Sequence, residues 1–188
     1  DGIEGAINDG NTLTRNLVLN ASSEILSDLK VRQAIAYAVN KEEITKGLTY
    51  GYETPATSLF APGAPYTDIT YNSTWSYDLD KANALLDEAG WVMNESTGIR
   101  EKDGQKLTIK WLTYPSRQEL PLLAESSQAT LKEIGMDVQV NCTSDSNTIR
   151  KDPAQWDVYA SAMVTAPTGD PENFFTTCAL DNSVSNNG

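Results

Sequence analysis

The sequence predicts an α/β fold. Strand-like and helical segments alternate along the chain, and residues 105–142 read as a strand, a helix and a strand at the spacing of a crossover unit. With 188 residues and 39% apolar content, the chain can bury one good core, so a single domain is the default. No run approaches the ~18 apolar residues that a membrane helix needs.

The first part of the chain predicts one strand and two helices. Residues 13–20 form a short β-branched and leucine-rich run, which indicates a strand. A helix capped by Ser27 or Asp28 follows, and its apolar stripe consists of Val31, Ala34, Ile35 and Ala38. Asn40 and Glu43 then have the spacing of a capping box, which predicts a second short helix that ends at Gly47.

Residues 51–77 read as a loop that wraps over the core. The stretch contains three prolines and six aromatic residues, and a disordered linker is rarely so rich in rings. Residues 78–90 then predict a helix that is capped by Asp78 and stopped by Gly90.

The second half of the chain predicts a hairpin, a crossover and a last strand. Asp103-Gly104 is a strong hairpin signal, and Leu107, Ile109 and Trp111 share one face of the strand that follows. A helical stripe over residues 120–134 leads to a strand in which Met136, Val138, Val140 and Cys142 alternate. Residues 156–164 form a further strand, which ends in the turn VTAPTGDP, where Asp170 is placed to cap a helix beginning at Pro171.

Several classes of function are excluded or disfavoured by the composition. The chain has no histidine, so catalytic relays and metal sites that use imidazole are impossible within it. It has neither a dinucleotide-binding nor a P-loop motif, and its net charge of -12 argues against nucleic acid. Carboxylate pairs such as Glu42/Glu43 and Asp87/Glu88 fall on predicted helix faces, where solvated charge is the expected state.

The cysteines and glycosylation sequons give weaker indications. Cys142 and Cys178 form either one disulfide or two inert core thiols. Four Asn-x-Ser/Thr sequons, at Asn20, Asn72, Asn94 and Asn141, fit exposure outside the cytoplasm.

Four segments resemble the family 5 extracellular solute-binding proteins, the peptide- and nickel-binding receptors of ABC importers. They are DLKVRQAIAYAVNKEEI (28–44), YDLDKANALLDEAGW (77–91), IREKDGQKLTIKWLTY (99–114) and LKEIGMDVQV (131–140). These segments occur in the family's order, the resemblance extends over about residues 15 to 175, and several phrases look closest to the nickel-type receptors.

This resemblance implies a type II periplasmic-binding-protein-like lobe, in which helices flank a mixed β-sheet. Residues 1–188 would be a single, partial ligand-binding lobe of a two-lobed receptor that closes on its ligand and is recognised by the membrane permease. We therefore expect no enzymatic activity, no cofactor, and a monomer located outside the cell or in the periplasm. A lipoprotein anchor would lie outside this fragment.

The same resemblance singles out the turn after the last strand. Peptide-binding relatives commonly have an aspartate there that binds the free amino group of the peptide, and the matching residue here is Pro167. Nickel-type relatives have Trp-Gly-Ala-Pro-Tyr-Asp-Pro, but Val164 and Thr168 stand at the Trp and Tyr positions and Gly169 is an extra residue. The expected ligand-binding residues are Val164, Thr165, Ala166, Pro167, Thr168 and Asp170.

The expected ligand is nickel held by a small-molecule chelator, since bare nickel favours imidazole or thiolate ligands. Short peptides are the alternative within the same family. Two functions of other classes stay open: a glycan hydrolase with two carboxylates about 5 to 9.5 Å apart in one cleft, and a surface interaction module.

Overall fold

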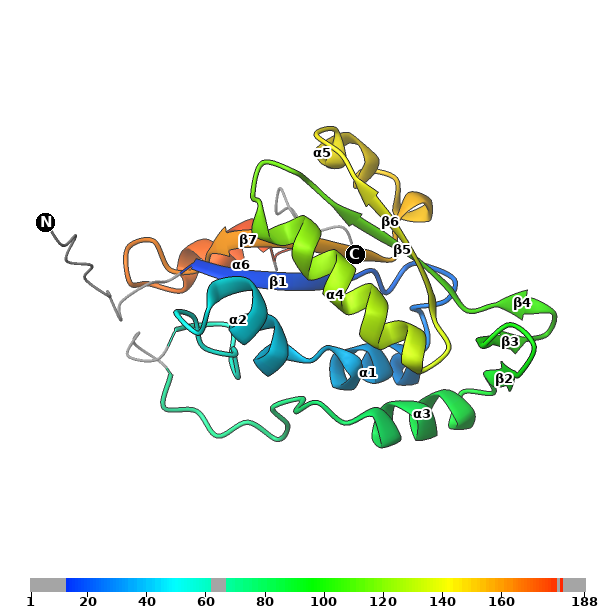
Figure 1. The fold of residues 1–188 in the computed structure, drawn as a ribbon. Coiled ribbons are helices and arrows are strands. Elements are labelled where there is room, and N and C mark those ends of the chain that lie inside the picture. Colours follow the sequence, from blue (N-terminus) through cyan, green and yellow to red (C-terminus); the bar gives the residue numbers. More distant parts are fainter. Residues whose placement is uncertain (1–12, 62–66, 179, 181–188) are drawn as a thin grey trace, which may run out of the picture.

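The computed structural model describes residues 13–61, 67–178 and 180 of the 188-residue chain. Strands and helices alternate, as predicted, around a central four-stranded sheet that crosses the molecule in Figure 1. Every helix in these residues is too short or too polar to cross a bilayer.

The central sheet is mixed. Its strand order is β1 (Leu13–Leu19), β7 (Val158–Val164), β5 (Thr108–Thr113) and β6 (Asp137–Cys142). β1 runs antiparallel to β7, whereas β5 is parallel to both β6 and β7. The predicted crossover is confirmed, because α4 (Glu119–Glu133) connects the parallel strands β5 and β6.

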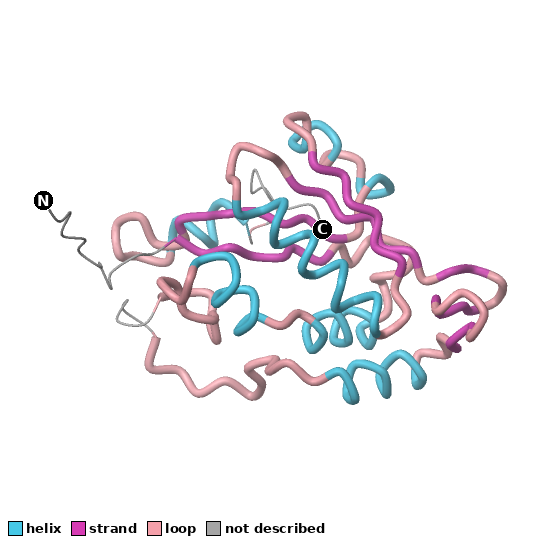
Figure 2. Tube along the Cα trace, in the orientation of Figure 1, coloured by secondary structure: helices cyan, strands magenta, loops and turns pink. Residues whose placement is uncertain are grey.

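Helices cover one face of this sheet and enclose the main core (Figures 1 and 2). α1 (Leu29–Ala38) and α4 contribute their predicted apolar stripes, and α3 (Leu79–Glu88) packs behind α1. Leu107, Ile109 and Trp111 face this core with no exposed surface, which confirms the predicted strand face. Ala160 and Val158 of β7 belong to the same core, so the even-numbered residues of β7 point toward the helices.

The opposite face of the sheet has a smaller cluster made of Leu112, Trp156 and Tyr159. Two short segments, α5 (Ser146–Ile149) and the 3-10 helix η1 (Pro153–Gln155), connect β6 to β7. The two faces of β7 therefore have different neighbours. One face packs against the helices, and the other packs against Leu112 and Trp156, so a ligand on one face contacts different residues of β7 from a ligand on the other.

A small second sheet contains the predicted hairpin. It consists of β2 (Val92–Asn94), β3 (Ile99–Lys102) and β4 (Gln105–Lys106). Asp103 and Gly104 have φ values of 52° and 79°, as the tight two-residue turn requires. The side chain of Arg100 anchors this sheet to α3 and to the end of α4.

Helix starts follow the predicted caps. Asp28, Asn40 and Asp78 each accept a hydrogen bond from a backbone N–H of the first helical turn. The predicted end of the second helix was wrong, because α2 (Lys41–Thr49) continues two residues past Gly47. The left-handed residue that ends the helix is Tyr50, with φ of 52°.

Burial is uneven along the last strand of the crossover and among the sequons. Met136 and Val138 are buried, but Val140 and Cys142 are exposed, because β6 is the edge strand of the sheet and its second half extends beyond the core. Asn20 is only 4% exposed, and its Nδ2 donates to the carbonyl oxygens of Pro153 and Trp156, both at 2.8 Å. Asn20 therefore joins two loops and is not accessible for a glycan, whereas Asn72 and Asn141 are exposed.

Candidate functional site

The predicted turn lies at the end of β7, and its residues differ in exposure. Val164 is 41% exposed, and Pro167, Thr168 and Asp170 are exposed as well. Thr165 and Ala166, by contrast, are buried. A ligand at this surface would therefore meet the turn through the four exposed residues.

Asp170 has the capping role that its sequence context predicts. Its Oδ1 accepts a hydrogen bond from Glu172 N at 2.8 Å, where α6 (Glu172–Cys178) begins. Gly169 adopts φ of 81°, and its N–H donates to the Ala166 carbonyl at 3.0 Å, which closes the turn. The exposed Pro167 and Thr168 lie between Ala166 and Gly169, the two residues that this hydrogen bond joins.

The turn belongs to a sheet edge that we name the carboxyl edge. It comprises the ends of β5 and β6, the length of β7 that continues past them to the turn, and the side chains of Tyr114, Arg150 and Tyr159. β5 and β6 end side by side at Thr113 and Cys142, and β7, which pairs with the end of β5 through Val158 and Tyr159, runs on past them to Val164. Ligands of open α/β sheets commonly bind outside such an edge.

The side chains of the carboxyl edge contact one another. Tyr114 Oη accepts a hydrogen bond from Ala162 N at 3.1 Å, and the rings of Tyr114 and Tyr159 are 6.2 Å apart. The Arg150 guanidinium lies 4.8 Å from the centre of the Tyr159 ring, which is a cation–π contact. Burial raises the pKa of Tyr159 above its usual value, so its phenol stays neutral. Tyr159 is only 4% exposed and is covered by Arg150 and Trp156, so the surface of this edge offers the half-buried ring of Tyr114 and the half-buried cation of Arg150.

Sequence reasoning missed Tyr114 and Arg150. Tyr114 directly follows a strand of the predicted crossover, so the rule applied to the turn after β7 also selects it. Arg150 had no comparable signal, since its position depends on how α5 folds back beside Tyr159.

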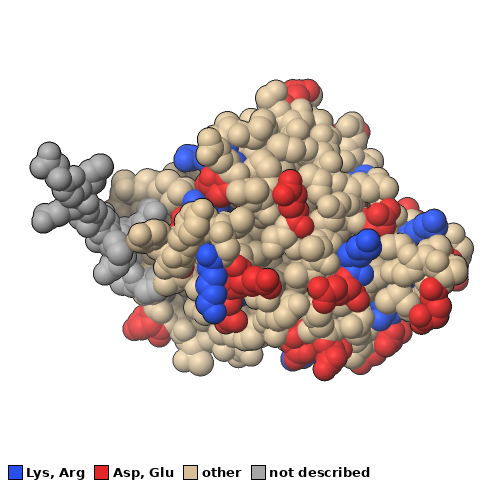
Figure 3. Space-filling view, in the orientation of Figure 1, with Lys and Arg blue, Asp and Glu red and all other residues tan. Residues whose placement is uncertain are grey.

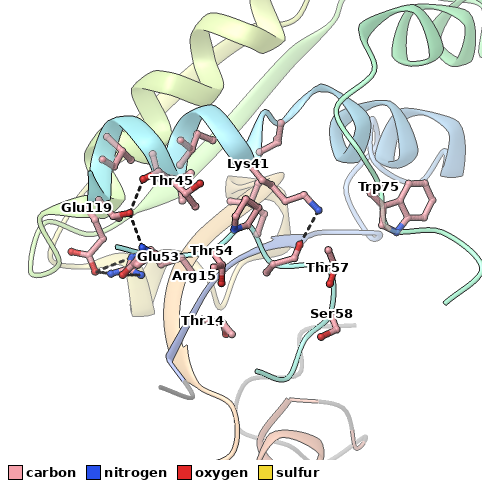
Figure 4. A pocket seen from close by; sticks show the side chains of 18 of the residues that line it. Thr14, Arg15, Lys41, Thr45, Glu53, Thr54, Thr57, Ser58, Trp75 and Glu119 are labelled. Atoms are coloured by element: carbon pink, nitrogen blue, oxygen red, sulfur yellow. Dashed lines mark hydrogen bonds and ion pairs between the residues drawn. The ribbon is translucent and has the colours of Figure 1, made fainter. Parts of the chain in front are cut away.

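A pocket of about 520 Å³ opens on the helix side of the sheet (Figure 4). We name it the helix-side pocket. It is lined by β1, α1, α2 and residues 52–61, together with Trp75, Glu119 and Leu123. None of the six predicted ligand-binding residues lines it.

One end of the helix-side pocket contains an ion-pair network. Arg15 Nη1 donates to Glu53 Oε1 at 2.7 Å, and its Nη2 and Nε donate to Glu119 Oε1 at 3.0 and 3.2 Å. These side chains are 22–34% exposed, so water screens their charges only in part. Farther along the pocket, Lys41 Nζ donates to the carbonyl oxygens of Ala56 and Thr74, and burial lowers the pKa of Lys41.

Neither a metal centre nor a disulfide is formed by the residues that the structure describes. They contain no group of three or more His, Cys, Asp and Glu side chains able to hold a metal ion. Cys142 and Cys178 are both free, Cys142 is exposed, and Cys178 Sγ lies 3.7 Å from Met163 Sδ. Both sequence alternatives, a disulfide and a pair of core thiols, are therefore wrong for Cys142.

The carboxylate pairs singled out in the sequence are exposed on helices. Glu42 and Glu43 lie on α2, and Asp87 and Glu88 lie at the end of α3. Acidic and basic side chains are interspersed over the face shown in Figure 3, and its described part has no continuous basic patch.

Comparison with known proteins identifies relatives over most of the chain. A family model described as bacterial extracellular solute-binding proteins, family 5 Middle, matches residues 3–186. The nickel-binding periplasmic protein of Escherichia coli (strain K12) is 38% identical over 124 residues, which are 66% of this chain and 24% of that protein. The oligopeptide-binding protein OppA of Lactococcus lactis subsp. cremoris (strain SK11) is 34% identical over 165 residues, which are 82% and 27% of the respective proteins.

The fold is that of type II periplasmic binding proteins. The crystal structure of NikA from Brucella suis in complex with Fe(III)-EDTA superposes with a TM-score of 0.82 and 33% identity, covering 92% of this chain and 34% of that chain. The chain spans about a quarter of the length of the curated relatives it matches. These relatives are solute-binding proteins and not enzymes.

Proposed function

Because the chain belongs to the bacterial extracellular solute-binding proteins of family 5, we propose that it is part of the substrate-binding component of an ABC importer for chelated nickel. Residues 1–188 form one lobe of a two-lobed receptor, and the solute is captured at the carboxyl edge when the lobes close. The closed receptor, a monomer, then delivers the solute to the permease. It works outside the cell or in the periplasm, attached through a lipoprotein anchor.

The observation that carries the choice of nickel over peptides is the identity of residue 167. By the family resemblance, peptide receptors have an aspartate at this position, which pairs with the amino terminus of the peptide. Pro167 is exposed in the turn and has no charge with which to hold an ammonium group. The acidic residue closest to Pro167 in the sequence is Asp170, and its side chain already accepts a hydrogen bond from the first turn of α6.

A chelate fits this edge better than a bare ion does. Nickel bound directly by protein favours nitrogen and sulfur ligands, and the chain has no histidine. Arg150 and the half-buried ring of Tyr114 instead suit a ligand with a carboxylate and a flat apolar surface. Nickel in a histidine-like chelator, which has a carboxylate and a ring, has both properties.

The proposal is tested by calorimetry and native mass spectrometry on the full-length protein. The ligands are nickel alone, nickel with a histidine-like chelator, and di- to pentapeptides. We expect the chelate to bind more tightly than nickel alone and the peptides not to bind. Binding of peptides only would assign the receptor to the peptide-binding branch and contradict the proposal.

A further inference from the structure

The helix-side pocket lies on the opposite face of the sheet from Tyr159 and Arg150, although Leu13 in its lining pairs with Val164 at the start of the turn. Side chains alternate between the two faces of a strand, and Leu17 pairs with Ala160 in the register of β1 and β7. Both residues face the helices, whereas Tyr159 packs on the opposite face. A ligand held by Arg150 beside Tyr159 therefore does not fill this pocket.

The pocket has the size and the apolar lining of a small-molecule site. Its volume of about 520 Å³ falls within the roughly 300–1,000 Å³ typical of such sites. Its apolar surface comes from four elements of the fold: Leu17 and Leu19 of β1, Ile35 of α1, Ile44 and Leu48 of α2, and Leu123 of α4. An aliphatic or small aromatic group can displace water from this surface.

Charge at one end of the pocket is unbalanced. The single guanidinium of Arg15 faces two carboxylates, and both of its partners bind it through Oε1 (Figure 4). Within the described part of the chain, Glu53 Oε2 and Glu119 Oε2 accept no hydrogen bond. This end of the pocket thus has a formal charge of -1 and two available acceptor oxygens. Lys41, the other charged residue of the lining, donates to two carbonyl oxygens.

Residues 52–61 form a wall over the apolar surface, and two side-chain contacts hold this wall in place. The ion pair between Glu53 and Arg15 connects residues 52–61 to β1, and the bond from Lys41 to the Ala56 carbonyl connects them to α2. Lys41 also donates to Thr74, so a second stretch of the long loop is held beside the first. A ligand entering this space meets a formed wall, and little ordering entropy opposes its binding.

We propose that the helix-side pocket is a second binding site, which takes a small primary amine with an apolar body. The ammonium group binds Glu53 Oε2 and Glu119 Oε2, and the apolar body lies against Leu17, Ile44 and Leu48. This proposal rests on the pocket alone and is independent of the solute that binds at the carboxyl edge.

The test compares three six-carbon probes on the full-length protein: hexan-1-amine, hexanoate and hexan-1-ol. Calorimetry at pH 7 is expected to show that the amine binds about tenfold or more tightly than the other two, because charge-assisted hydrogen bonds form only with the ammonium. No binding of the amine would overturn the proposal, and so would equal or tighter binding of hexanoate or the alcohol.

Two variants locate the site. L48W fills the pocket and leaves the ion-pair network intact, so amine binding should be lost while chelate binding at the carboxyl edge is kept. The double variant E53Q/E119Q should weaken amine binding about tenfold or more, with E125Q as the control, because Glu125 is an exposed acid on the same helix as Glu119. Undiminished amine binding by L48W would place the probe elsewhere and overturn the assignment.

Discussion

Replacing the two members of one ion pair should have very different effects on stability. Arg100 is 4% exposed, whereas its partner Asp87 is 67% exposed. Arg100 also donates from Nε to the Ile134 carbonyl at 2.9 Å, from Nη1 to the Trp91 carbonyl at 2.5 Å and from Nη2 to Asn83 Oδ1 at 2.9 Å. The guanidinium thereby connects the small sheet to the ends of α3 and α4.

The expected loss follows from these contacts. In R100M, the carbonyl groups of Ile134 and Trp91 lose a charged donor inside the protein, at about 1–3 kcal/mol each, so the unfolding free energy should fall by about 3 kcal/mol. In D87N, the lost ion pair is largely solvated and contributes about 0–1 kcal/mol. The structure therefore predicts that the arginine matters for its buried hydrogen bonds and not for its salt bridge.

Urea denaturation of both variants checks this asymmetry. At a slope of about 1–3 kcal/mol per molar urea, R100M should lower the midpoint by about 1–3 M, and D87N should leave it nearly unchanged. R117M is the control, because Arg117 is exposed and its side chain makes no hydrogen bond or ion pair within the described residues. Equal midpoint shifts for R100M and D87N would refute the reasoning.

Four further predictions address the turn, the backbone, the thiols and a lysine. In the full-length protein, P167D should create affinity for peptides with a free amino terminus but not for N-acetylated ones, as calorimetry can measure. G135A should destabilise more than G98A in thermal melts: both glycines have positive φ, but only at Gly135 would a Cβ lie 2.7 Å from Arg100 Cγ. Ellman's reagent should label the exposed Cys142 faster than Cys178, because burial raises the pKa of the Cys178 thiol; equal rates in the C142S and C178S variants would contradict this. Burial also lowers the pKa of Lys41, so between that lowered pKa and the ordinary value of 10.5 the unfolded chain binds more protons and stability rises with pH. This rise should be smaller in K41M.

Local signals in the sequence predicted most of the fold because the forces that set helix and strand ends are local. The caps at Asp28, Asn40 and Asp78 each bind an N–H two or three residues away, and the Asp103-Gly104 turn needs only its own backbone. The crossover could likewise be predicted from the spacing of its three elements. Burial in β6 could not, because its position at the sheet edge depends on the strand order of the whole sheet.

The candidate binding regions were harder to predict because they join distant segments. Arg15 is 38 residues from Glu53 and 104 residues from Glu119, and no spacing rule connects them. Tyr114 is 48 residues from Ala162, whose N–H donates to it. The turn after β7 was found because a single continuous motif contains it, and even there the burial of Thr165 depends on tertiary packing.

The two candidate regions should differ in the sign of the charge they select. The carboxyl edge has the cation of Arg150 beside aromatic rings, which favours an anionic or neutral ligand such as a carboxylate chelate of nickel. The helix-side pocket has two carboxylates against one guanidinium, which favours a cation. Since Leu17 and Ala160 face the helices whereas Tyr159 packs on the opposite face, the ion-pair network and Arg150 lie on opposite faces of the sheet, and neither ligand reaches the charges that attract the other. An amine and a chelate should therefore bind together without competition, and mutual displacement would mean that both occupy one cleft.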